Sequence, residues 1–149
     1  MPDTLDPALV PELLVEDLDR SLAFWCGACG FTVAYDRPDE RFAYLVLGSA
    51  HVMLEQVGIG RNWVTGPLDR PFGRGINLQV TVPDSAAIAD RLDAAGVRLF
   101  MRPETKWYDL GAEEAGVQQF LVQDPDGYLL RFQSSVGRRP TARRSDRNS

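Results

Sequence analysis

Apolar residues recur in the same order along two stretches of the chain, residues 15–33 and 82–100. Each stretch begins with Val, any residue and Asp, continues with apolar positions at helical spacing, and ends with Gly before a short apolar run. Apolar positions three or four apart predict an amphipathic helix. Asp is a favoured N-cap, and Gly permits the left-handed backbone that follows many helices. We therefore predict two equivalent helices, at residues 17–30 and 84–96.

The segments around these helices also match each other. Residues 8–17 align without gaps to residues 75–84, and both contain apolar runs of strand length. Residues 45–57 align to residues 121–133, and each segment carries a turn signal between two apolar runs, Gly-Ser-Ala in one and Asp-Pro-Asp-Gly in the other. Each half of the chain is thus predicted to form a strand, a helix and three further strands. We therefore predict a protein built from two copies of a βαβββ unit.

The repeat divides the chain into five parts. They are an N-terminal arm at residues 1–7, a first module at 8–57, a connector at 58–74, a second module at 75–135 and a basic tail at 136–149. The connector is rich in Gly, Pro and Arg, and a second irregular stretch is predicted at residues 102–116. The tail is polar and has no apolar periodicity, so we predict that it is disordered.

Charge is unevenly distributed along the chain. The net charge is −5, and residues 137–149 contain five Arg and one Asp, so the rest of the chain carries −9. An acidic body argues against nucleic-acid binding and suits a cationic small ligand.

The sequence lacks an apolar run long enough to span a membrane, and its first residues do not resemble a secretory signal. We therefore expect a cytoplasmic protein, whose thiols stay reduced.

The segment at residues 24–31, Phe-Trp-Cys-Gly-Ala-Cys-Gly-Phe, contains the C-x-x-C spacing of thiol–disulfide oxidoreductases. In those proteins the cysteines lie at the start of a helix, where the positive end of the dipole lowers the thiol pKa. Here Cys26 and Cys29 fall in the last turns of the predicted helix, just before Gly30. The negative end of the dipole raises a thiol pKa there. We interpret the segment as a helix end and not as a redox site.

Two segments carry a resemblance to a known family: VPELLVEDLDRSLAFW with the following GF at the start, and QFLVQDPDGYLLRF at the end. With the repeat, they make residues 8–135 similar to the vicinal oxygen chelate superfamily, which includes glyoxalase I, extradiol dioxygenases and bleomycin-resistance proteins. Within it, the two segments look most like bleomycin-resistance proteins. The resemblance implies an α+β fold in which two tandem βαβββ modules form a cleft-shaped, half-open β-barrel, commonly in a homodimer.

Enzymes of this superfamily usually bind a divalent metal through His and Glu side chains on the first and last strand of each module. The matching positions here are Val10, Glu55, Asn77 and Arg131. Only Glu55 is a good ligand, because Val offers no lone pair and Arg is a cation without an acceptor. His51 is the only histidine, so a two-His site cannot form within one chain. We predict no metal and no other cofactor, while a shift of two residues would leave a site with Glu12 and Glu55 open.

Other positions suit a ligand. Glu55 and Arg131 are expected to form an ion pair, which either closes the core where relatives hold metal or contacts a polar ligand. Strand alternation places Met53 and His51 on the face of Glu55, and Gln79 on that of Asn77. His51 is a ligand contact or base, or else a surface residue.

Three aromatic residues fall in predicted irregular segments: Trp63 in the connector, and Trp107 with Tyr108 in the second module. Such residues either stack on planar ligands or seal loops and dimer contacts. The full set of predicted ligand-binding residues is Met53, Glu55, Trp63, Asn77, Gln79, Trp107, Tyr108 and Arg131.

These observations favour a non-catalytic protein that binds and sequesters a small molecule of the antibiotic type, similar to bleomycin, which is cationic and carries flat rings. The alternative is a metal-dependent lyase, isomerase or dioxygenase of the glyoxalase type. The expected partners are a cationic, aromatic small molecule and a second copy of the chain, with no nucleic acid and no membrane. Pro11 matches a proline of bleomycin-resistance proteins, where the N-terminal arm passes to the partner, so the resemblance suggests arm exchange.

Overall fold

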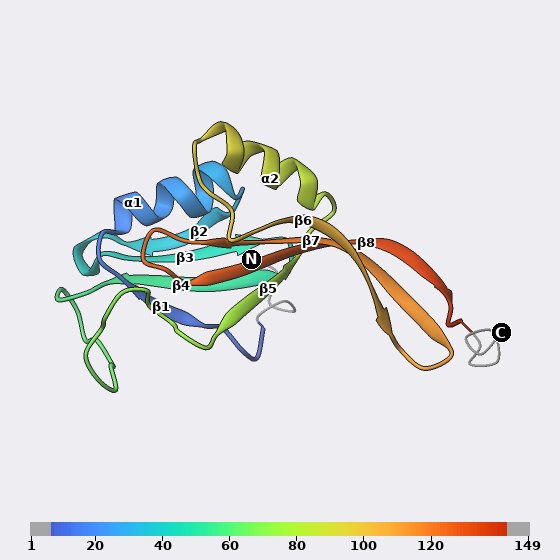
Figure 1. The fold of residues 1–149 in the computed structure, drawn as a ribbon. Coiled ribbons are helices and arrows are strands. Elements are labelled where there is room, and N and C mark those ends of the chain that lie inside the picture. The colour runs from blue at the N-terminus through green and yellow to red at the C-terminus, as the bar shows by residue number, and fades with distance from the viewer. Residues whose placement is uncertain (1–6, 143–149) are drawn as a thin grey trace.

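A computed structural model describes residues 7–142 of the chain (Figure 1). The first half contains β1 (Glu12–Val15), α1 (Leu18–Leu22), the π-helix η2 (Ala23–Ala28), β2 (Thr32–Arg37), the 3-10 helix η3 (Pro38–Glu40), β3 (Phe42–Leu47) and β4 (Ala50–Gln56). The second half contains β5 (Asn77–Thr81), α2 (Ser85–Ala94), β6 (Met101–Asp109), β7 (Glu113–Gln123) and β8 (Leu129–Pro140). The predicted order of strand, helix and three strands is therefore confirmed in both halves.

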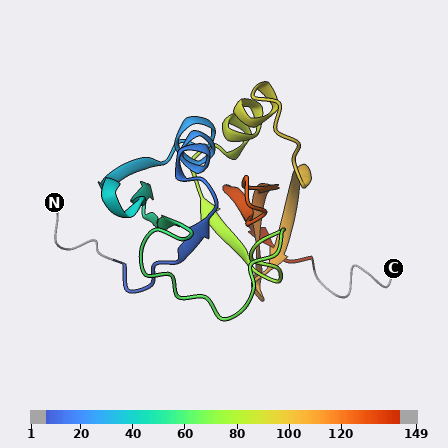
Figure 2. The same ribbon diagram turned by 90° about the vertical axis from the view of Figure 1, so that its left-hand side faces the viewer.

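Each half forms one four-stranded mixed sheet. The strand order is β1-β4-β3-β2 in the first sheet, called sheet A here, and β5-β8-β7-β6 in the second, called sheet B. The first and last strands of each half pair in parallel, and the other pairs are antiparallel. The two helices lie beside each other, and β1 and β5 are neighbours at the junction of the sheets (Figures 1 and 2). The predicted α+β fold of two modules, with sheets that do not close into a barrel, is confirmed.

Both helices begin and end where the sequence predicts. The Asp17 carboxylate accepts the backbone N–H groups of residues 19 and 20 at 3.0 and 3.3 Å, and that of Asp84 accepts the N–H of residue 87 at 3.2 Å. Gly30 and Gly96 follow the helices with φ of 90° and 77°, values that glycine adopts without strain. The helices thus have the N-caps and stop signals that the repeat predicts. The first helix differs in one respect, because its second half is a π-helix.

One hydrophobic core lies between the helices and both sheets. It contains alternate residues of the inner strands and of β1 and β5, such as Val52 and Leu54 of β4 and Leu130 and Phe132 of β8, whereas β2 and β6 contribute none. The residues between them point to the opposite side of each sheet. We call these sides, which face away from the helices, the open face of sheet A and the open face of sheet B. They are where a ligand-binding surface can form.

Cys29 belongs to this core. Its side chain is fully buried, and both cysteines are free thiols. Burial raises the pKa of Cys29 to about 12 and also raises the pKa of Cys26. A thiol that stays protonated is a poor nucleophile, which supports the interpretation of this segment as a helix end.

Three predicted boundaries are wrong. The first strand begins at Glu12 and not at residue 8, since residues 7–11 form no strand. The stretch 102–116, predicted to be irregular, lies almost entirely in the β6–β7 hairpin. β8 continues to Pro140, so residues 136–140 of the predicted disordered tail are strand; residues 143–149 lie outside the described part of the chain.

The longer β8 pairs with β7 as far as Pro140, which lies opposite Glu113, and side-chain ion pairs accompany this pairing. Arg138 lies 3.2 Å from the Glu113 carboxylate, and Arg139 lies 2.8 Å from that of Glu114. The ion pairs lie where β7 and β8 pair in a part of the sheet that extends beyond the helices as an arm (Figure 1). The sequence pattern missed this because the arm has no helix to pack against, so its strands lack the apolar alternation of half-buried strands.

Among residues 7–142, no helix is long and apolar enough to cross a membrane.

Candidate ligand-binding site

The open face of sheet A carries two neighbouring carboxylates. Glu12 pairs with Met53, and Leu14 pairs with Glu55, so the four side chains share one face of the parallel β1–β4 pair. Glu55 is 8% exposed. The connector covers it, because a Cβ added at Gly60 would lie 2.6 Å from its Oε1 atom. Burial and the nearby Glu12 carboxylate raise the pKa of Glu55. A positive group that entered here would relieve this repulsion.

Aromatic rings continue this face across β3 and β2. Phe42 is paired with Glu55 and Tyr44 with Met53. The rings of Tyr35 and Tyr44 are stacked with centroids 4.9 Å apart, and the Tyr44 hydroxyl lies 2.7 Å from Nδ1 of His51. Sequence reasoning missed the three rings. The signal was present, since aromatic residues occupy alternate positions of Phe-Ala-Tyr-Leu-Val-Leu at residues 42–47.

The open face of sheet B is built on amide and guanidinium groups. Arg131 donates to Oε1 of Gln79 at 2.7 Å. Gln119, which the sequence analysis did not single out, is 4% exposed and donates to Glu104 and to the Tyr108 hydroxyl at 3.1 and 2.8 Å. Within residues 7–142, Nε of Arg131 and Oε1 of Gln119 are buried without a partner. This face therefore offers polar groups with unused hydrogen-bonding capacity.

The structure places the three aromatic residues that were predicted to contact the ligand on different surfaces. Tyr108 reaches Gln119 on the open face of sheet B. Trp107 directly precedes Tyr108 in the same strand, so its side chain lies on the other face of the sheet. There the Arg139 guanidinium is 3.9 Å from the centroid of the Trp107 ring. Trp63 is 77% exposed in the connector, with Arg61 over its ring. The structure thus brings Tyr108 to the open face but not Trp107.

The expected ion pair between Glu55 and Arg131 is absent among the described residues. Glu55 lies under the connector on sheet A, while Arg131 bonds to Gln79 on sheet B. The strand registers also place Glu12, and not Val10, beside the residues of β4, because β1 begins at Glu12. In the second module the corresponding pair is Gln79 with Arg131. Each module therefore has its own pair of first-strand and last-strand side chains.

These pairs do not fit a divalent metal. Arg131 places a permanent cation with no acceptor at one of the presumed ligand positions, and Gln79 offers only an amide. Glu12 and Glu55 are two ligands where structural and catalytic sites use three or more. Across residues 7–142, no group of three His, Cys, Asp or Glu side chains could hold a metal ion.

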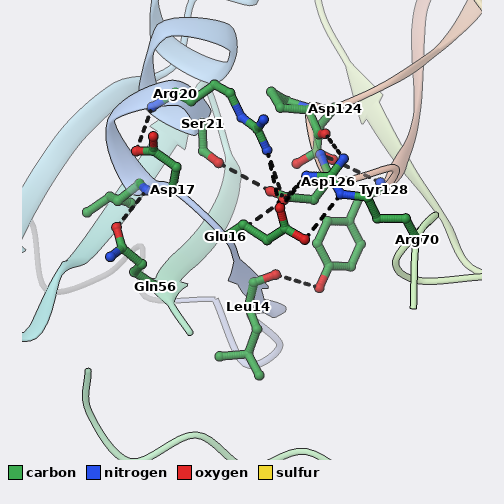
Figure 3. Close-up of polar contacts among 12 residues, drawn as sticks. Leu14, Glu16, Asp17, Arg20, Ser21, Gln56, Arg70, Asp124, Asp126 and Tyr128 are labelled. Carbon is green, nitrogen blue, oxygen red and sulfur yellow. Dashed lines mark hydrogen bonds and ion pairs between the residues drawn. The ribbon is translucent and has the colours of Figure 1, made fainter. Parts of the chain in front are cut away.

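A polar cluster fixes the two modules against each other (Figure 3). At its centre is Asp126 of the Asp-Pro-Asp-Gly turn, whose fully buried carboxylate accepts the backbone N–H of Glu16 at 3.2 Å and the hydroxyl of Ser21 at 3.4 Å. Arg20 and Arg70 lie 3.4 and 3.3 Å from the same carboxylate. The turn of the second module is thus bonded to the start of the first helix and to the connector.

Asp124, in the same turn, should make stability depend on pH. Burial raises its pKa to about 6, although Trp25 Nε1 donates to it at 3.2 Å. Because the folded pKa lies above the unfolded one, the contribution of Asp124 to stability is complete only below the unfolded pKa of 3.8 and is lost as the pH rises from there through about 6. We expect the free energy of unfolding of the wild type, relative to Asp124→Asn, to fall by about 2–3 kcal/mol between pH 4 and 7. Urea titrations across this range measure it, and parallel curves would contradict the assignment.

The fold defines a class of proteins made of two βαβββ modules, and comparison with known proteins agrees with it. The model of the glyoxalase/bleomycin resistance protein/dioxygenase superfamily matches residues 5–132. The chain belongs to this superfamily. A comparison with curated proteins gave no match.

Solved structures of the same kind are similar to the chain. A superfamily member from Vibrio splendidus 12B01 is 37% identical over 84% of this chain and 95% of its own, with a TM-score of 0.39. TioX from Micromonospora sp. ML1 is 24% identical over 88% of this chain and 100% of its own, with a TM-score of 0.68. A virulence protein from Salmonella typhimurium is 18% identical over 88% of this chain and 98% of its own, with a TM-score of 0.63. The last two support the fold alone.

Proposed function

We propose that the protein binds and sequesters a small molecule of the antibiotic type, without catalysing a reaction on it. The observation that carries the proposal is the Arg131–Gln79 hydrogen bond of 2.7 Å. A cation and an amide therefore stand at the first-strand and last-strand positions of the second module, where enzymes of the superfamily would need metal ligands. A guanidinium and an amide are groups that recognise a ligand, whereas neither can activate one through a metal.

The open face of sheet A favours a ligand that is cationic and flat. The Glu12 and Glu55 carboxylates attract a positive group, and Tyr35 and Tyr44 offer stacked rings beside them. Aromatic faces also attract cations directly. The face thus combines the two features that the acidic composition and the resemblance to bleomycin-resistance proteins imply.

We further propose that the ligand site is completed in a homodimer in the cytoplasm. Glu55 and Arg131 do not meet within one chain, and Tyr35 on the open face of sheet A is 44% exposed. A second copy that laid its sheet B over this face would bring Arg131, Tyr108 and Gln79 to the carboxylates. Sedimentation at micromolar concentration tests this, and a monomer that still binds the ligand would rule out a dimeric site.

A second candidate is a metal-dependent enzyme of the glyoxalase type. The observation in its favour is that Glu12 lies beside Glu55, so two carboxylates share one face. At the first-strand and last-strand positions of sheet B a second copy would add no acidic ligand, because the pair there is Gln79 and Arg131. Metal analysis of the purified protein tests this candidate: stoichiometric metal that supports turnover of a thiohemiacetal or a catechol would replace the binding proposal.

The charge at Glu55 should control ligand affinity. Isothermal titration with bleomycin is expected to show saturable binding, and Glu55→Gln should weaken it by about tenfold or more, since a partly buried charged hydrogen bond contributes roughly 1.5–3 kcal/mol. Asp90→Asn removes one negative charge from the exposed side of α2, on the opposite side of the sheets from both open faces, and is expected to leave the affinity within about twofold. Equal losses in both variants would indicate a general charge effect. If the wild type shows no binding, the proposed ligand is wrong.

A further inference from the structure

A cavity of about 370 Å³ lies where the two modules meet, at the beginning of β4 and of β5. Its most buried lining residues are Trp25, Phe31, Val52 and Val80, which are all core residues with at most 5% exposure. The segment of residues 7–11 lines it from the other side. The cavity is therefore a recess into the shared core, and its lining includes neither Glu12 nor Glu55. It borders the open faces at two residues, because His51 lies 2.7 Å from the Tyr44 hydroxyl and Gln79 accepts from Arg131.

This recess is open because the strands on its two sides, β4 and β5, lack a strand partner there. β1 begins opposite Met53, so the first three residues of β4 have no strand partner on that side. Residues 7–11, which precede β1, form no strand, and two of them are prolines that lack a backbone N–H. β5 stands at the edge of its own sheet. The gap between β4 and β5 is thus covered by the N-terminal segment without being filled by it.

The lining specifies the chemistry of an occupant. Trp25 and Phe31 present two rings with centroids 5.2 Å apart, and the Trp25 indole N–H already donates to Asp124, so this end of the cavity is apolar. Polar side chains line the rest of it together with apolar residues such as Leu9, and they are Ser49, His51, Asn77 and Gln79. No Asp, Glu, Lys or Arg of the described chain lines it. A charged ligand would lose its hydration there without gaining a counter-charge.

We propose that this junction cavity is a second small-molecule site, which takes a neutral aromatic compound with one hydroxyl or carbonyl group. The rings of the compound would lie against Trp25 and Phe31, and its polar group would reach His51, Asn77 or Gln79. Since a cavity of about 150 Å³ holds one benzene, the volume of this one suits about two fused rings. Ligand pockets of this size, apolar with few polar groups, commonly lie at such junctions.

The test uses 2-naphthol as the probe and the full chain as the protein. In Trp63→Phe/Trp107→Phe protein, the remaining indole N–H signal in a ¹H–¹⁵N spectrum belongs to Trp25. It is expected to shift saturably with 2-naphthol, together with the amides of residues 50–52 and 77–80. Naphthalene-2-carboxylate has the same rings and a charge, and we expect it to bind at least about tenfold more weakly.

Two variants decide whether the cavity is the site. Ala50→Leu adds side-chain volume inside it and should weaken 2-naphthol binding by about tenfold; Ala87→Leu, on α2 outside the cavity, should leave it unchanged. If Ala50→Leu fails to fold, Ser49→Phe at the exposed β3–β4 turn narrows the same cavity with little risk to the core. The proposal is overturned if 2-naphthol does not bind, if its shifts map to Phe42 and Glu55 instead of the cavity, or if these variants bind it normally. It is also overturned if the same signals move with protein concentration instead, which would mean that a second copy fills the cavity.

Discussion

Replacing Asp126 with alanine is expected to lower the free energy of unfolding by about 3 kcal/mol or more. Its carboxylate is fully buried and is bonded to the Glu16 backbone and the Ser21 hydroxyl of the first module. It also pairs with Arg20 and with Arg70 of the connector. Removing it leaves these donors without their shared acceptor at the junction of the modules (Figure 3). Urea denaturation at pH 7 measures the loss.

Two further variants separate the charge from the side-chain contacts. Asp126→Asn keeps the shape and one acceptor oxygen but loses the charge. Its free energy of unfolding should therefore fall between that of the wild type and that of the alanine variant. Asp36→Ala, at an exposed position of β2, is expected to change stability by less than about 0.5 kcal/mol. If Asp126→Ala matched Asp36→Ala, the cluster would not hold the modules together.

The second large effect is expected at Gly127, in the same turn. Its φ is +106°, and a Cβ at this position would lie 2.6 Å from Cα of Pro71 and 2.9 Å from the backbone nitrogen of Phe72. Gly127→Ala therefore adds backbone strain and also pushes the connector away from the turn. We expect a loss of about 2–4 kcal/mol in the free energy of unfolding, measured by the same denaturation.

Gly137 provides a matched control for this variant. Its φ is +111°, close to that of Gly127, and a Cβ there would meet no atom within 4 Å. Gly137→Ala should therefore show only the cost of the left-handed backbone, about 1–2 kcal/mol. The difference between the two alanine variants measures the contact with the connector. Equal losses would mean that the turn and the connector separate without cost.

Much of the fold could be predicted from local signals. Asp17 and Asp84 cap helices because a carboxylate accepts backbone N–H groups wherever a helix begins, and Gly30 and Gly96 end them because φ is positive there. The alternation that places Met53 with Glu55 likewise follows from strand geometry alone. These signals repeat in the two halves, so the prediction for each half supported that for the other, and the structure confirms both.

The arm and the first strand could not be predicted in this way. The strands of the arm are joined by backbone pairing between β7 and β8 and carry charged side chains, such as Arg139 with Glu114, so they leave no apolar alternation in the sequence. Nor does alternation show where pairing begins. Residues 8–11 look like a strand, yet pairing with β4 starts at Glu12. The register therefore moved the first-strand position of the candidate site from Val10 to Glu12.

The sequence by itself determined the two βαβββ modules, the helix ends and the side of each strand that carries Glu55 or Arg131, because these depend on local geometry. Only the tertiary structure decided which of those side chains meet. It placed Glu55 beside Glu12 and Arg131 beside Gln79, and it separated Trp107 from Tyr108. It also left a cavity between the modules. Contacts of this kind depend on how distant segments pack, and no periodicity within one segment records that packing.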